Sequence, residues 1–183
     1  MSDYRRLYVP GGTYFFTVRL QDPTSDLLVR QIALLRDATR LTMKRFPFTI
    51  DAAVVLPAKL HMIWTMPADD ADFSKRWRMI KSGFSRHVPS PVHIPRSHVQ
   101  RGEKGIWQRR FWEHLIRDAD DLLLHQHLIR SAPVHAGLVS RPGDWPHSSF
   151  ARLRTTGPVP SAPDREAVVT ASRTVATVDS EMS

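Results

Sequence analysis

The chain has 183 residues, of which 26 are Lys or Arg and 18 are Asp or Glu, so its formal net charge is +8. This length suits one domain with a hydrophobic core, and 42% apolar residues with five tryptophans exclude a chain that is disordered throughout. The lack of cysteine excludes disulfides, thiolate metal sites and a cysteine nucleophile, and no apolar run approaches the roughly 18 residues of a membrane span.

No apolar stretch of the signal-peptide type follows residues 1–6, so we expect a cytoplasmic protein.

The segment 13–20 follows the turn signal Pro10-Gly11-Gly12 and is rich in β-branched and aromatic residues, which predicts a strand. Apolar residues recur at helical spacing from 25 to 44 and predict a helix. The alternation continues, with expected strands at 48–56, 60–66 and 105–116 and expected helices at 73–88 and 119–129, the last ending before Pro133.

The predicted order, β-α-β-β-α-β-α, is the split βαβ arrangement with one further C-terminal helix. It indicates an α+β fold whose antiparallel sheet has helices packed on one face. The other face, or a cleft beside it, is then available for a ligand. We assign this domain to residues 1–154.

The charge is distributed unevenly along the chain. Residues 1–154 hold 24 basic and 14 acidic residues, a net charge of +10, which favours a polyanionic partner. Of all 26 basic residues 21 are Arg, which binds phosphate bidentately, although an Arg-rich codon usage explains the same ratio. Residues 155–183 hold two basic and four acidic residues and no aromatic residue, which predicts a disordered acidic tail.

The segment from Trp107 to His114 is the richest in candidate nucleic-acid contacts. It combines Trp107 and Trp112, which could stack on bases, with Arg109 and Arg110, which could bind phosphates. The alternative is a strand with core aromatics and solvated arginines. Neither face of such a strand is purely apolar, so we favour nucleic-acid binding.

Two other segments carry basic residues. The helix expected at 73–88 includes Arg78 and Lys81, and the pair Arg5 and Arg6 forms a basic arm before the first strand. A basic helix face is more often merely solvated. Lys59 and His61 share one face of a strand, where a single histidine is more often structural than a metal ligand.

Taken together and in order, several segments resemble REP-associated tyrosine transposases, which are IS200-like enzymes. The resemblance covers about residues 4–150. The segments that carry it are Tyr4-Arg-Arg, Pro10-Gly-Gly-Thr-Tyr-Phe-Phe-Thr17, Asp51 to Pro57, His61-Met-Ile-Trp64, Phe73 to Trp77, Ile80-Lys81, Trp107 to His114 with Ile116-Arg-Asp118, Pro133-Val134 with Gly137-Leu-Val139, and Asp144 to Phe150.

The resemblance implies an α+β domain that acts on single-stranded DNA and on palindromic repeats folded as hairpins. In the family, a His-hydrophobe-His motif binds a divalent metal that polarises the scissile phosphate, and a helix tyrosine attacks that phosphate. Family members often form homodimers. No membrane is implied.

This chain departs from the family where the chemistry resides. Lys59 stands in place of the first metal-binding histidine, so only His61 remains, and Leu128 stands in place of the tyrosine. Ser131 lies three residues further along, with nothing to indicate that it is activated. We therefore expect an inactive DNA-binding protein that requires no cofactor, with at most a vestigial Mg²⁺ or Mn²⁺ site at His61.

Lys59 suggests a hypothesis of its own, in which its ammonium neutralises the DNA phosphate in place of the metal. Neutral drift after loss of activity explains the substitution equally well. Two other functions stay open, an active transposase or nuclease with a different nucleophile and an RNA-hairpin binding module. The expected DNA contacts are Arg5, Arg6, Lys59, Arg78, Lys81, Trp107, Arg109, Arg110, Trp112 and His114.

Overall fold

The computed structural model describes residues 6–91 and 94–151 and confirms an α+β fold with an antiparallel sheet. The strands are β1 (Thr13–Arg19), β2 (Thr49–Val55), β3 (Lys59–Thr65) and β4 (Trp112–Leu115). The helices are α1 (Leu27–Arg30), α2 (Ile32–Arg45), α3 (Phe73–Arg86), α4 (Arg96–Val99), α5 (Ala119–His135) and the 3-10 helix η1 (Pro142–Asp144). Arg5 and the segment 155–183 lie outside the described residues.

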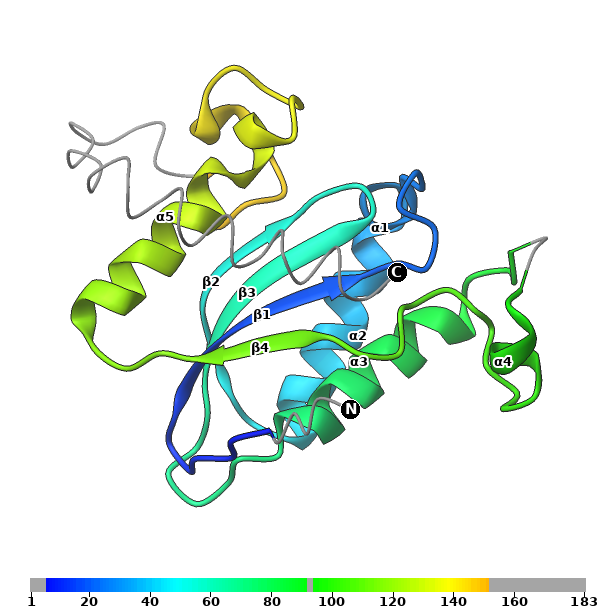
Figure 1. The fold of residues 1–183 in the computed structure, drawn as a ribbon, viewed down its shortest axis with the longest axis horizontal. Coiled ribbons are helices and arrows are strands. Elements are labelled where there is room, and N and C mark those ends of the chain that lie inside the picture. Colours follow the sequence, from blue (N-terminus) through cyan, green and yellow to red (C-terminus); the bar gives the residue numbers. More distant parts are fainter. Residues whose placement is uncertain (1–5, 92–93, 152–183) are drawn as a thin grey trace, which may run out of the picture.

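The four strands pair in the order β2-β3-β1-β4, and every neighbouring pair is antiparallel. Side chains of a strand alternate between the two faces of the sheet. In β1, Tyr14, Phe16 and Val18 point to the layer of α2 and α3, whereas Phe15 and Thr17 point to the side of α5. The expected helical layer on one face is thus present, and the further C-terminal helix covers part of the other face (Figure 1).

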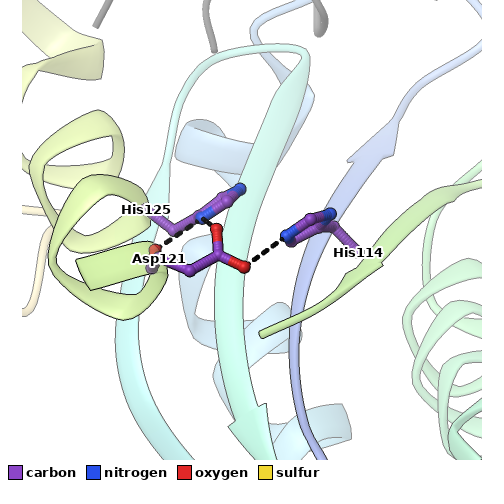
Figure 2. Close-up of side chains that lie close together, drawn as sticks. All are labelled: His114, Asp121 and His125. Carbon is purple, nitrogen blue, oxygen red and sulfur yellow. Dashed lines mark hydrogen bonds and ion pairs between the residues drawn. The ribbon is translucent and has the colours of Figure 1, made fainter. Parts of the chain in front are cut away.

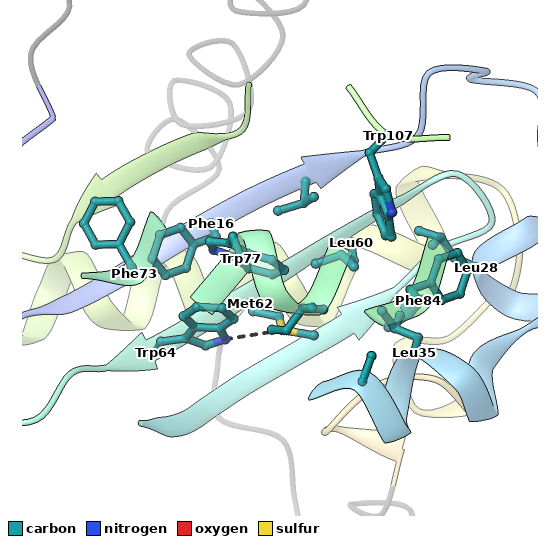
Figure 3. Packing of buried hydrophobic residues seen from close by; sticks show 14 of the residues in the cluster. Phe16, Leu28, Leu35, Leu60, Met62, Trp64, Phe73, Trp77, Phe84 and Trp107 are labelled. Atoms are coloured by element: carbon teal, nitrogen blue, oxygen red, sulfur yellow. Dashed lines mark hydrogen bonds between the residues drawn. The ribbon is translucent and has the colours of Figure 1, made fainter. Parts of the chain in front are cut away.

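The larger core lies between the sheet and the layer of α2 and α3. Trp64 of β3 stacks on Trp77 of α3 with ring centroids 4.2 Å apart and an interplanar angle of 16°, and Phe16 packs against both (Figure 3). Aromatic rings bury large apolar areas, so this cluster fixes α3 on the sheet. The smaller core on the opposite face joins Ile129 of α5 to Phe15 and Ile63.

Two predicted boundaries are wrong. The strand expected at 105–116 is shortened to β4, because Trp107 turns into the larger core and contributes only an isolated bridge to Leu20. The helix expected to end before Pro133 continues to His135. Because Pro133 lies in the last turn, its missing N–H removes only the bond to the carbonyl of Ile129. In the described part of the chain, no helix is long and apolar enough to cross a membrane.

Candidate functional site

The sheet separates the candidate DNA contacts into two groups. The register pairs Thr17 with both His61 and Trp112, and Phe15 with His114, so these side chains lie on the face that α5 partly covers. On the α3 side, other candidates line a cleft of about 890 Å³ between α3 and the segment 98–111. The sequence did not reveal that its candidate residues form two separate groups.

On the α5 face, His61 is buried and its Nδ1 lies 2.9 Å from the hydroxyl oxygen of Thr17. Burial, followed by the positive charges of Lys59 and Arg19, lowers the pKa of His61 to about 3, so the imidazole is neutral at physiological pH. Arg19 and Lys59 stand directly opposite each other in the register of β1 and β3. Burial and the charge of Arg19 also lower the pKa of Lys59.

These residues do not fit the divalent metal that the family pattern implies. A histidine pair would offer two neutral nitrogen ligands, whereas here one position holds an ammonium group. A second cation, Arg19, lies in the facing strand position. A divalent ion beside two positive side chains would be repelled, and His61 alone is an incomplete ligand set.

Leu128 and Ser131 lie on α5, in the helix where the family pattern requires a tyrosine. Leu128 is half-buried and its neighbour Ile129 is in the smaller core. The hydroxyl of Ser131 donates to the main-chain carbonyl of His127 over 2.9 Å, so it serves to bond the helix backbone. Leu128 has no nucleophilic atom, and the Ser131 hydroxyl bonds main-chain carbonyls and no general base.

Sequence analysis missed a cluster formed by His114 of β4 with Asp121 and His125 of α5 (Figure 2). The carboxylate of Asp121 lies 2.9 Å from His114 Nε2 and 3.1 Å from His125 Nδ1. Its other partner is Arg117, whose Nε donates over 3.0 Å. Burial acts to raise the pKa of Asp121, but the hydrogen bonds from His114 and Arg117 outweigh it and lower the pKa to about 2.

The ligand atoms of this cluster lie within 4.8 Å of one another, so His114, Asp121 and His125 could hold a metal ion. In the structure, the guanidinium of Arg117 already supplies a positive charge to the carboxylate. The cluster ties β4 to the first turns of α5, since Asp118 caps the helix by accepting from the N–H of Asp121. The spacing of His125 four residues after Asp121 was the available sequence signal.

The cleft on the α3 side is strongly basic. Among the described residues that line it, Glu103 is the one carboxylate. The cations that line it are Arg6, Arg78, Lys81, Arg86, Arg101, Lys104 and Arg109. A concave surface lined by charges of one sign concentrates its electrostatic potential and attracts an oppositely charged ligand.

Several of these cations are held in place by neighbouring groups. Lys81 donates to the carbonyl of Gln108 over 2.8 Å, and burial, followed by the charge of Arg6, lowers its pKa to about 8. Arg6 forms an ion pair with Glu113 at 3.4 Å, and its guanidinium lies 3.9 Å from the centroid of the Phe111 ring. The cleft is therefore lined by positive groups in fixed positions and by the aromatic ring of Phe111.

The remaining candidates differ in exposure. Arg78 and Arg110 are exposed and have no ion pair within the residues described, whereas Arg109 donates to Glu103 over 2.9 Å. Trp107 retains only 7% exposure and donates to the hydroxyl of Ser85 over 3.0 Å. The Trp107 ring therefore packs mainly in the larger core. Trp112 is half-buried against Phe15 on the other face.

Known proteins provide a comparison for this arrangement. The REP-associated tyrosine transposase of Escherichia coli K12 is 45% identical over 152 residues, which span 83% of this chain and 84% of that protein. A solved REP-associated tyrosine transposase, described as bound to a REP hairpin, superposes with a TM-score of 0.74 and is 44% identical. The superposition covers 90% of this chain and 93% of the other. No family model matches the sequence.

Proposed function

Because the chain belongs to the REP-associated tyrosine transposase family, we propose that it binds palindromic DNA repeats, as hairpins or single strands, without cleaving them. The solved relative is described as bound to a REP hairpin, which supports this class of ligand. Binding and cleavage depend on different parts of the molecule, the basic cleft and the residues at Lys59 and on α5.

The basic cleft carries the binding half of the proposal. Phosphate contacts supply most of the affinity of DNA-binding proteins, and arginine and lysine make most of these contacts. The cleft places Arg6, Lys81 and Arg109 in fixed positions, each bonded to a neighbouring group, while Arg78 stays exposed. We expect these residues to contact the DNA backbone, and Arg110 and Trp112 to contact DNA near β4.

The side chains on α5 support the loss of cleavage. Phosphodiester transfer requires a nucleophile, and Leu128 offers none. The two tyrosines that the structure describes lie on the α3 side, where the Tyr8 hydroxyl contacts Ser74 and the Tyr14 hydroxyl donates to the carbonyl of Leu7. Tyr4 lies outside the described residues. With Lys59 in place of a metal ligand, the chain lacks both parts of the family's chemistry.

Binding of a labelled palindromic DNA hairpin, compared with a scrambled strand of equal length, tests the proposal directly. We expect the hairpin to bind more tightly in Mg²⁺ and in EDTA alike. Equal weak binding to both DNAs would show non-specific charge attraction and refute hairpin recognition. An RNA hairpin of the same sequence serves as competitor, and stronger binding of RNA would replace DNA with RNA as the ligand.

A denaturing gel of protein incubated with labelled DNA and Mg²⁺ tests the loss of chemistry. We expect no covalent protein–DNA adduct. An adduct would restore the alternative of an active transposase or nuclease, and replacing Tyr8 by Phe would show whether that tyrosine forms it.

A further inference from the structure

Arg19 and Lys59 form a pair of like charges at one end of the central strands of the sheet. They are directly opposite in the register of β1 and β3, which are the two central strands. Like charges at such positions destabilise a sheet. Both side chains are only partly exposed, and the Lys59 ammonium makes no hydrogen bond or ion pair with any residue that the structure describes. Two cationic side chains on one face of the sheet can bind one anion between them.

We propose that Arg19 and Lys59 together bind one phosphate of the single-stranded DNA that flanks the hairpin, in place of a divalent metal. This inference rests on the proposed function and names a site for the single strand that is separate from the basic cleft. An anion between the two side chains would be attracted by both positive charges. A guanidinium adds a planar fork that matches two phosphate oxygens, and the ammonium adds a point charge.

The surroundings of the pair suit a phosphodiester. The two side chains together carry a charge of +2, which equals the charge of the metal ion they would replace. His61 is neutral and lies on the same face, two residues after Lys59. When the Thr17 hydroxyl donates to Nδ1 of His61, the ring proton lies on Nε2 and can serve as a further hydrogen-bond donor. Trp112, paired with Thr17 on the other side of β1, offers a ring near the same face.

The test uses two labelled hairpins with the same stem, one blunt and one with a short single-stranded flank. Lys59→Met and Arg19→Gln should each weaken binding of the flanked hairpin about tenfold to a hundredfold. Both variants should bind the blunt hairpin like the parent. The matched control, Lys44→Met, removes an exposed lysine of α2 and should leave both affinities unchanged.

A second arm alters the DNA and compares the parent with Lys59→Met. Methylphosphonate linkages, which are uncharged, replace the flank phosphates one at a time. We expect one position to weaken binding to the parent and to have little effect on Lys59→Met, because the contact is already lost there. Replacing Mg²⁺ by EDTA at constant ionic strength should leave the affinity for the flanked hairpin unchanged.

The outcomes separate this inference from the proposed function. If the parent binds the blunt hairpin but the flank adds no affinity and no methylphosphonate matters, the phosphate site is refuted while hairpin binding stands. If binding of the flank requires Mg²⁺, the pair does not replace a metal. If the parent binds neither hairpin above the scrambled strand, both proposals fall.

Discussion

Lys81 gives the cleft a pH dependence that can be calculated from its pKa. With a pKa of about 8 in the free protein, the ammonium is roughly 90% protonated at pH 7 and roughly 10% at pH 9. If a DNA phosphate restores the pKa toward the ordinary value of 10.5, bound Lys81 stays protonated at both pH values. Proton linkage then makes binding about tenfold weaker at pH 9 than at pH 7, or about 1.4 kcal/mol.

Fluorescence anisotropy of a labelled hairpin at pH 7, 8 and 9, at constant ionic strength, measures this effect. Lys81→Met should bind more weakly at pH 7 and lose most of the pH dependence. The comparison with this variant is necessary because an α-amino group titrates in the same range. A pH profile that is flat in the parent, or equally steep in Lys81→Met, would refute the assignment of Lys81 to the DNA contact.

The remaining predictions concern the charge of the cleft and the stability of the fold. Arg78→Gln should lower the salt slope of hairpin binding by about one, measured between 50 and 200 mM salt, whereas Arg36→Gln on α2 should leave the slope unchanged. Asp121→Ala should lower the free energy of unfolding in urea by about 1–3 kcal/mol, because it removes the charged partner of His114 and Arg117, whereas His125 keeps its bond to the main-chain carbonyl of residue 121. A loss below about 0.5 kcal/mol would contradict that role. Since the pKa of Asp121 is lowered to about 2, its contribution should be complete above about pH 4 and be lost as the pH falls toward 2, so the parent and Asp121→Ala should converge in stability across that range.

Local sequence patterns predicted the elements whose formation depends on their own residues. Alternating and β-branched residues located β1, and the periodicity of apolar residues located α3, because a buried strand or helix face must repeat at these intervals. The order of elements then indicated the antiparallel sheet. The break at Gln31 between α1 and α2 was not predicted, since the apolar spacing continues across it.

The errors occurred where tertiary contacts decide the conformation. Trp107 leaves strand geometry because its ring is accommodated between α3 and the sheet, which no local pattern shows. The cluster around Asp121 depends on the pairing of β4 with β1, which brings His114 beside α5. In the same way, the sequence suggested Lys59 as a phosphate contact but gave no sign of Arg19, which is 40 residues away and adjacent only through the register of β1 and β3.

The stacked pair of Trp64 and Trp77 gives the protein an intrinsic optical probe. One indole belongs to β3 and the other to α3, so their contact at 4.2 Å exists only while the helix is docked on the sheet. Separation of the two rings would change the near-ultraviolet circular dichroism and the tryptophan emission. These two rings lie in the larger core, whereas Lys59 and Arg19 point to the opposite face of the sheet. Their signal can therefore show, without any added label, whether each variant that loses DNA binding still has a docked helix.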